Sequence, residues 1–587
     1  MTTLCPPHTS QGKYRDPNLL HGTPEYKARK EDTDRIFDDA LDATHEIIFY
    51  LSPLVGEWLA PTHPYLRADR GEPPSEWMRS GPVAITRAWC NFELSTAVAR
   101  GHKLRVALQP TDQAELEALL KSGKVDVLFS ILARIDANDA QISKAEDRDD
   151  ILPRVQEAGG FNHMNKLVKD ALRGWLCDAA LGALQEADAS GGAPLSLVSG
   201  LARMFKDQGL YGTAETFYRR LLSTREESDG AEHPDTLVTM NNLATLLRMM
   251  GNFVEAESLY RHTADRFEEF YGETDPLTVD MLSNLGAVLR EQGQYAEAEI
   301  LYRRVLDARE DSHGPNHTDT ALAVNALGVL LKDLGRLDEA ASLYWRALDA
   351  RTTQLGNNHP LTLLSHNNIG VLLKDRGEFG EAETHLRHAL DGQEEMLGPF
   401  HHHTLATMNN LGDLLNEQQK HRDAELLIRK ALEGQVASLG ESHPETLGSK
   451  NNLAIVLRSQ GSHDQAATLV RHILHEREAL LGSLHPHTVS SINNLGVLLA
   501  DQNECGAAEQ LLRRGLEGRE SWLGPGHPRT LASLHNLVVF LRSQEAMVEV
   551  DALSARMQQQ DMLQFCRSKQ VVAGHGNFIM ASFNSPA

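Results

Sequence analysis

Apolar residues recur at helical spacing over most of the chain, and this pattern is itself repeated every 42 residues. Each unit contains two apolar segments, which are separated by a glycine such as Gly251 and followed by a second glycine such as Gly272. The units keep one register without an insertion, so we assign residues 192–562 to a single repeat array. A recurring alanine in the second segment marks the register: Ala214, Ala256, Ala298, Ala340, Ala382, Ala424, Ala466 and Ala508.

Turn and cap residues divide each unit into two helices. Pro234 suits the first turn of a helix, where its missing N–H costs nothing, and we expect Thr236 to bond a free backbone donor in that turn. Gly251 interrupts the apolar pattern, and Gly272 ends the second helix. Because neither helix can bury its apolar stripe alone, neighbouring units must stack into an α-solenoid. The sequence predicts eight full helix pairs and a ninth that fades after Gln544.

The repeat resembles a known family. Leu243, Ala244, Gly251, Ala256 and Tyr260 match the tetratricopeptide repeat (TPR) signature, and HEAT and armadillo repeats lack this spacing. A His-Pro-x-Thr-Leu opening and a Leu-Gly closing make the unit similar to the variant found in kinesin light chains. The resemblance implies a mainly α fold, a TPR solenoid whose first helices line a concave surface that binds proteins.

Two polar columns lie seven residues apart along the first helix of each unit, and therefore share a helix face. The carboxamides of one column can pair with the backbone of an extended peptide, and the basic residues of the other would favour an acidic peptide. In kinesin light chains, matching positions bind cargo peptides that carry acidic residues. The groove residues that we predict are Asn241, Arg248, Arg290, Asn325, Lys332, Asn367, Lys374, Asn409, Asn451, Arg458 and Asn493.

Each of these columns also has a structural interpretation, which the sequence leaves open. The asparagines can serve packing alone, and Arg248 and its equivalents can pair with a glutamate on the next helix. The neighbouring column that begins with Asn242 is expected to bridge to the adjacent loop. His233 and its equivalents open the units and lie too far apart to share a metal, and the run His401–His403 fits the same opening. We therefore expect no metal site and no cofactor.

The region before the repeats follows another pattern, in which strand-like runs alternate with helical segments. This alternation predicts a small α/β domain over residues 34–178, with a parallel sheet. Residues 1–33 are expected to be disordered, residues 179–191 to form a linker and residues 563–587 a C-terminal tail. The predicted strands are Ile47–Pro53, which ends in a turn, Leu104–Pro110 and Val125–Ile131, and the predicted helices are Thr86–Arg100, Asp112–Ser122, Asp147–Glu157 and His163–Leu172.

Part of this region is similar to a Toll/interleukin-1 receptor (TIR) domain. Ser52 ends a predicted strand, and Trp89–Leu94 reads WCNFEL; plant-type TIR domains have a Trp-Cys-x-x-Glu-Leu helix after a strand that ends in Ser. The resemblance implies that Glu93 matches the catalytic acid of TIR enzymes that cleave NAD. The alternative is a structural carboxylate that holds Arg87 or a backbone amide. No buried first strand precedes the motif, so we expect a divergent or truncated TIR-like domain.

Charge and composition limit the classes of partner. The formal net charge of −24 argues against nucleic-acid binding and against docking on anionic membranes, since both depend on an excess of Lys and Arg. The sequence contains neither an apolar run of about 18–20 residues, as a spanning helix needs, nor the apolar core of a signal peptide at its start. Five scattered cysteines without CxxC spacing fit a reducing, cytoplasmic environment.

Taken together, these patterns favour a non-enzymatic cytoplasmic adaptor or scaffold. The solenoid would bind a protein or an acidic peptide in its groove, and the N-terminal domain would supply a second contact, such as self-association. The alternative is a TIR-like NAD hydrolase or signalling protein, in which the TPR array acts as a sensor or an assembly arm.

Overall fold

The computed structural model describes residues 46–50, 98, 103–107 and 160–559. The chain divides into two compact units, and the second consists of Phe205–Gln435 together with the residues from Glu441 onward. The predicted segments 1–33 and 563–587, and most of the predicted α/β domain, lie outside the described residues. Among the described helices, none is long and apolar enough to cross a membrane.

Two short strands and a long helix are described in the first unit. Strands β1 (Glu46–Tyr50) and β2 (Lys103–Ala107) pair in parallel, with Ile48 opposite Arg105, where the sequence predicts two strands of a parallel sheet. Helix α6 (Gly160–Ala189) contacts β2 and includes the predicted helix His163–Leu172. It also runs through most of the predicted linker 179–191, so that segment is helical as far as Ala189.

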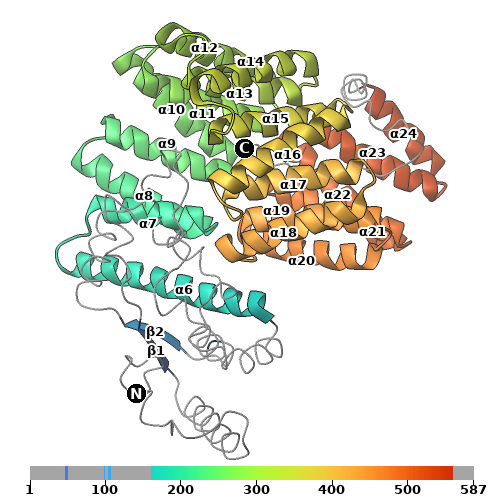
Figure 1. Ribbon diagram of the computed structural model, residues 1–587, viewed down its shortest axis with the longest axis horizontal. Helices are drawn as coiled ribbons and strands as arrows, with labels where there is room; N and C mark the ends of the chain where they lie inside the picture. The colour runs from blue at the N-terminus through green and yellow to red at the C-terminus, as the bar shows by residue number, and fades with distance from the viewer. Residues whose placement is uncertain (1–45, 51–97, 99–102, 108–159, 560–587) are drawn as a thin grey trace, which may run out of the picture. The chain divides into compact units, whose positions relative to one another are not determined.

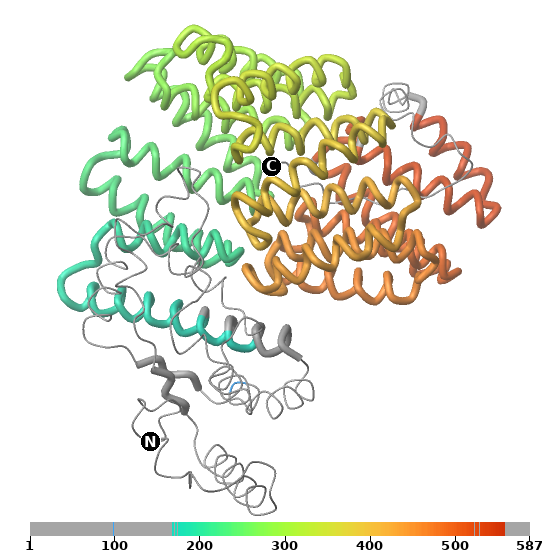
Figure 2. The backbone as a smooth tube through the Cα atoms, viewed as in Figure 1, coloured from blue at the N-terminus to red at the C-terminus, as the bar shows by residue number. Residues whose placement is uncertain are grey.

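From Leu195 onward the described chain consists of antiparallel helix pairs (Figures 1 and 2). The first helices of the pairs are α7 (Leu195–Asp207), α9 (Pro234–Met249), α11 (Pro276–Glu291), α13 (Thr318–Asp333), α15 (Pro360–Asp375), α17 (His402–Glu417), α19 (Pro444–Ser459), α21 (Pro486–Asp501) and α23 (Pro528–Ser543). The second helices are α8 (Tyr211–Ser228), α10 (Phe253–Tyr271), α12 (Tyr295–His313), α14 (Leu337–Leu355), α16 (Phe379–Met396), α18 (His421–Leu439), α20 (His463–Leu481), α22 (Cys505–Leu523) and α24 (Met547–Gln559). This solenoid confirms the predicted helix pairs.

Small residues allow the two helices of each pair to approach closely. The recurring alanine is completely buried at Ala256 and Ala298, as is the neighbouring Tyr260. On the first helix, a Cβ added to Gly286 would lie 3.0 Å from the ring of Tyr302. Burial of a large apolar side chain contributes about 1.5–3 kcal/mol, and each repeat buries several of them against its neighbours.

A histidine, rather than the predicted threonine, caps the first helix of most repeats. Nδ1 of His233 accepts a hydrogen bond from the backbone N–H of Asp235 at 3.2 Å. Equivalent bonds recur at His317, His359, His401, His443, His485 and His527, and Asp275 replaces the histidine in α11. The threonine is instead fully buried, and Thr320 Oγ1 donates to the carbonyl oxygen of Gly314 in the preceding loop at 2.8 Å.

The two glycine columns differ in how strictly they require glycine. Gly272 has φ 90° and ψ 169°, a conformation that is essentially confined to glycine, and every equivalent position in the array is glycine. The turn between the two helices has a left-handed residue such as Gly251, with φ 76°. Non-glycine residues tolerate this second conformation at a modest cost, and Gln419, Asn503 and Glu545 adopt it in later repeats.

The array curves back on itself, so that early turns touch helix starts six repeats later (Figure 1). A Cβ built on Gly251 would lie 2.8 Å from Cδ2 of His485 and 3.0 Å from Cδ of Pro486. Gly209 meets His443 and Gly293 meets His527 in the same way, always across 234 residues of sequence. These contacts join successive turns of the superhelix.

The second ring nitrogen of the histidine forms hydrogen bonds in these contacts between superhelical turns. Nε2 of His485 donates to the carbonyl oxygen of Met249 at 3.1 Å, and Nε2 of His527 lies 2.8 Å from the hydroxyl of Tyr295. Since Nδ1 of each ring already accepts a bond from its own helix, the arrangement requires the neutral imidazole. Burial, together with the charge of Arg477, lowers the pKa of His485 to about 4.

We predict that Gly251→Asn destabilises the array more than Gly377→Asn. Both glycines have positive φ, 76° and 80°, so the two substitutions share the same backbone cost. Only the Cβ at position 251 collides with another residue, because nothing lies within 4 Å of a Cβ at position 377. The difference should be about 1–3 kcal/mol, the usual cost of overpacking, measured by urea denaturation. Equal losses would show that closure adds no stability.

Candidate protein-binding surface

The predicted groove columns lie on the helices that face the inside of the solenoid. The first helices of successive repeats contact each other directly, as α15 does with α17 and α17 with α19. In a curved stack, the helices that approach each other across repeats lie on the side of smaller radius. The first helices therefore form the inner wall of the array.

The asparagines of the inner wall bond to one another rather than projecting into solvent. Asn241, Asn367, Asn409, Asn451 and Asn493 are all buried, at most 8% exposed. Their side chains form rungs between successive first helices. The donors and acceptors of these rungs are Asn284 Nδ2 to Asn241 Oδ1 (3.1 Å), Asn410 to Asn367 (3.0 Å), Asn494 to Asn451 (2.8 Å) and Asn536 to Asn493 (3.3 Å).

Two of the predicted asparagines deviate from this ladder. Nδ2 of Asn409 donates to the carbonyl of Leu405 and to Ser449 Oγ, which lies in the next repeat, at 3.1 and 2.7 Å. Asn325 is half-buried, and its Oδ1 has no hydrogen-bond partner in the structure. The second asparagine column, represented by Asn284 and Asn410, supplies the donors, which agrees with its predicted bridging role, although the bridge reaches a helix and not a loop.

The basic column forms a second ladder, in which each cation pairs with a carboxylate of the following repeat. The sequence left open that Arg248 and its equivalents pair with a glutamate, and the acids that form the pairs stand directly after the base in most units, as in Arg290-Glu291. The pairs are Arg248 with Glu291, Arg290 with Asp333 (2.7 Å), Lys332 with Asp375 (3.2 Å) and Arg458 with Asp501 (2.6 Å). The cationic side chains of these four pairs are 17–26% exposed, so solvent reaches one side of each pair.

Lys374 differs from the rest of its column because its partner lies deeper. It binds Asp413, and both side chains are only 9% exposed. Although burial opposes the charged amine, Asp413 and Asp375 raise the pKa of Lys374. Asp413 is the single acid at its position: three repeats later the same two places are taken by Ala500 and Val539.

This difference between repeats yields a double-mutant prediction. Asp413→Val alone should cost about 3–5 kcal/mol, because Lys374 would stay buried without its close partner. Lys374→Ala combined with Asp413→Val recreates the apolar pair at 500 and 539, and should recover most of that loss. The measurement is the free energy of unfolding of both single variants and the double variant; additive losses would contradict the pairing.

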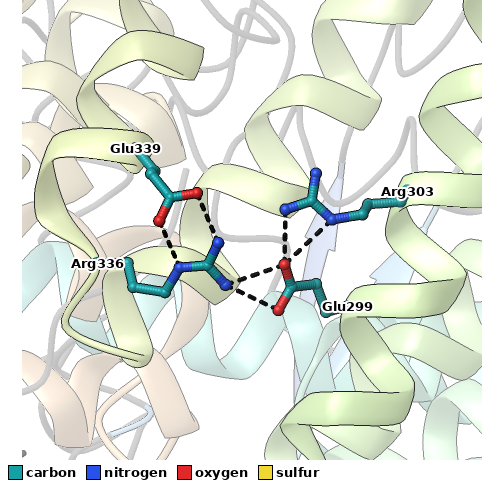
Figure 3. Close-up of polar contacts among 4 residues, drawn as sticks. All are labelled: Glu299, Arg303, Arg336 and Glu339. Atoms are coloured by element: carbon teal, nitrogen blue, oxygen red, sulfur yellow. Dashed lines mark hydrogen bonds and ion pairs between the residues drawn. The ribbon is translucent and has the colours of Figure 1, made fainter.

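A third set of ion pairs joins the second helices on the outer side. Glu299 accepts from Arg303 at 2.7 Å and from Arg336 at 2.9 Å, and Arg336 also contacts Glu339 at 2.5 Å (Figure 3). Hydrogen bonding by Glu339 and Glu299 raises the pKa of Arg336, although burial opposes this effect. Such exposed pairs contribute about 0–1 kcal/mol each, so this network mainly keeps neighbouring repeats in register.

One repeat carries a cluster of aromatic rings that sequence reasoning did not find. His366 in α15 and His385 in α16 approach with their Nδ1 atoms 2.8 Å apart, and Trp345 in α14 packs edge-on against His385. The other repeats have apolar residues at most of these two histidine positions, such as Leu282 and Leu343. Burial, together with the nearby histidines, lowers the pKa of His366 to about 4.

We predict that His366→Leu combined with His385→Leu weakens the acid sensitivity of the array. When folding lowers the pKa of a histidine, the fold has its full stability at pH values above 6.5, the ordinary pKa of histidine. This stability is lost as the pH falls towards about 4. Between about pH 7 and 4.5 the double variant should lose roughly 1 kcal/mol less, because the rings are only half-buried. Urea denaturation at both pH values tests this, and an unchanged pH dependence would refute it.

The surface along the turns between the two helices of a pair is hollowed at two neighbouring places. One hollow of about 410 Å³ is lined by residues 461–465 with Asp501 and Gln502. The other, of about 720 Å³, is lined by residues 419–423, Glu425, Gln460 and Ser462. Within the described part of the chain, no group of three or more His, Cys, Asp or Glu residues is arranged to hold a metal, and the run His401–His403 is no exception. Glu93 and Arg87 lie outside the described residues.

Comparison with known proteins identifies the repeat. The family model described as "Tetratricopeptide repeat" matches residues 194–269, 277–353, 319–395, 361–435 and 445–521, together more than half of the chain. No curated protein matches the sequence. This family match lies within the repeats, so the resemblance to a TIR domain rests on the sequence motif alone.

Several solved structures are similar at low identity. A putative kinesin light chain with nearly identical TPR-like repeats from Podosopora anserina is 21% identical, covering 35% of this chain and 97% of that chain, with TM-score 0.31. BtubC (BKLC) from P. vanneervenii is 22% identical, covering 40% and 92%, with TM-score 0.33. A Rap protein in complex with competence and sporulation factor is 14% identical, covering 64% and 98%, with TM-score 0.44. At these values the structures carry no argument about function, whereas the family match and the helix pairs agree: the chain belongs to the tetratricopeptide repeat family.

Proposed function

We propose that this protein is an interaction scaffold without catalytic activity, and that its inner wall binds an extended acidic segment of a partner protein. The observation that carries the proposal is the ladder of partly exposed ion pairs, with one cation in each of three successive repeats, at Arg248, Arg290 and Lys332. Protein binding is the common use of a TPR array. The ladder supplies a regular series of contacts along the wall.

Binding would proceed by exchange of ion-pair partners. A carboxylate of the ligand would take the place of Asp333 on Arg290 or of Asp375 on Lys332, and the displaced carboxylate would return to solvent. These pairs are partly exposed, so each exchange would cost less than at the buried pair of Lys374, and affinity would come from several exchanges in series. Lys374 does not fit this role well, because Asp413 holds it in the interior.

In this proposal the asparagines do not bind the ligand, in contrast to the sequence-based prediction. Its carboxamides are occupied between repeats, and a peptide that used them would leave buried polar atoms unpaired at a cost of about 1–3 kcal/mol each. We therefore assign the asparagines to the alignment of the first helices. Asn325 has the same place, because its unpartnered Oδ1 is buried and out of reach of a ligand.

Variants of opposite charge should change affinity in opposite directions. Asp333→Asn with Asp375→Asn frees Arg290 and Lys332 from competition, and should strengthen binding of an acidic peptide. Arg290→Gln with Lys332→Gln removes the ligand's partners and should weaken binding. We expect about three- to tenfold in each direction at low salt and less at high salt, since exposed charges are screened. The probe is a peptide selected from a random displayed library on the full-length protein.

A matched control lies on the outer side of the same repeats. Arg303→Gln also removes one partner of an ion pair with a carboxylate, Glu299, but away from the inner wall, and should leave affinity unchanged. Selected peptides without an excess of Asp and Glu, or affinities that ignore both inner-wall variants, would contradict the proposal.

The alternative function, NAD hydrolysis with Glu93 as the acid, rests on the sequence motif alone. Incubation of the purified protein with NAD tests it directly. Release of nicotinamide that is abolished by Glu93→Gln would support the enzyme, and no release would favour the scaffold.

A further inference from the structure

The contact between superhelical turns has two sides, and both sides recur elsewhere in the array at places where the described residues show no such contact. We call the first the turn edge: the turns between the helices of a pair, which include Gly377 and Gly461. The second is the histidine edge: the helix starts at His233, His317 and His359. In the internal contacts, the turn edge is represented by Gly209, Gly251 and Gly293 and the histidine edge by His443, His485 and His527.

Exposure separates the covered from the uncovered examples. His485 is 7% exposed beneath the turn of Gly251, whereas the side chain of His317 is 38% exposed and His233 is exposed. On the other side, Gly377 and Gly461 are both exposed, and a Cβ at either position meets nothing within 4 Å. The uncovered edges therefore repeat the two halves of a contact that the array already makes.

The chemistry and shape of the uncovered turn edge match the covered one. Phe379 follows Gly377 just as Phe253 follows Gly251, and Phe253 is buried in the covered repeat while Phe379 is half-buried. Two hollows, of about 410 and 720 Å³, lie along this edge, at residues 461–465 and at residues 419–423 with Glu425. The surface is thus concave where the internal contact would place a helix start.

We propose that the turn edge of one molecule binds the histidine edge of a second copy of the same chain. The chain supplies both sides of the contact and already joins them three times within itself, at a constant separation of 234 residues. The interface is heterologous, since two different surfaces meet. Association is therefore head to tail, and it leaves one edge of each kind free for further copies.

Sequence differences among the turns fit this interface. The three turns that are covered internally all have glycine, which the close approach of an imidazole demands. Among the uncovered turns, Gly377 and Gly461 keep glycine, whereas Gln419 and Asn503 do not. Turns that retain glycine are the ones where a second imidazole can approach as closely as His485 approaches Gly251.

Two sets of substitutions test the two edges separately. Gly377→Asn with Gly461→Asn adds a Cβ at each turn; in the internal contacts, a Cβ at the equivalent glycine would lie only 2.7–2.9 Å from the nearest atoms of the facing helix start. Asparagine tolerates this backbone conformation, as Asn503 shows. His233→Asn with His317→Asn and His359→Asn removes the imidazoles but keeps an acceptor that caps the helix, as Asp275 does. Gly174→Ala with Gly182→Ala is the control, because these helical glycines have open space at Cβ.

Sedimentation velocity of the full-length protein over a range of concentrations gives the association constant. We expect wild type to associate reversibly, each edge variant to lose about tenfold or more in association constant, and the control to match wild type. Circular dichroism checks that the variants fold; if the asparagine turn variant does not, the histidine-edge variant decides by itself. A wild type that stays monomeric, or association that neither edge variant weakens, overturns the proposal.

Mixing the two edge variants provides a sharper test of direction. A molecule with an altered turn edge still has an intact histidine edge, and the other variant has the reverse. Head-to-tail contact therefore predicts that the mixture forms dimers with wild-type affinity but no longer assemblies. An interface made of one surface meeting itself would not be restored by mixing, and that result would also overturn the proposal.

Discussion

Neither helix of a repeat can bury its apolar face without the neighbouring repeats, and this dependence controls how the polar groups are used as well. Stacking brings Ala256 and Tyr260 to complete burial, and the same stacking carries Asn241 into the interior beside Asn284. A buried carboxamide must be hydrogen-bonded, so the polar residues of one repeat are completed by those of the next. The asparagine rungs and the ion pairs therefore follow from the packing and fix its register.

The local structure was largely predictable, because it depends on residues within one repeat. The helix boundaries follow from Pro234, Gly251 and Gly272, and the structure has helices where these residues place them. The cap was assigned to Thr236 instead of His233, because histidine is an uncommon cap and the threonine occupies the usual kind of position. The roles of the inner-wall residues were harder to predict, because Arg290 pairs with Asp333, which lies 43 residues further along the chain and is brought close only by the stacking of the repeats.

The closure of the superhelix could not be derived from the repeat. It results from small rotations between neighbours, which add up over six repeats until Gly251 reaches His485. An error of a few degrees per repeat would open the contact or make it clash. One trace was nevertheless present in the sequence: the early turns are all glycine, whereas Gln419, Asn503 and Glu545 replace it in later ones. The reason for that difference lies far away along the chain.

Closure also changes the way in which the array resists force. In an open solenoid every repeat touches only its neighbours, so the ends fray first and a pull at the ends is borne by one interface after another. Here the repeats that contain Gly209, Gly251 and Gly293 also contact repeats that lie 234 residues further along the chain. Because successive turns of the superhelix are in contact, the array resists compression along its axis. Extension must first separate the imidazoles from the turns that they contact, before any helix unfolds.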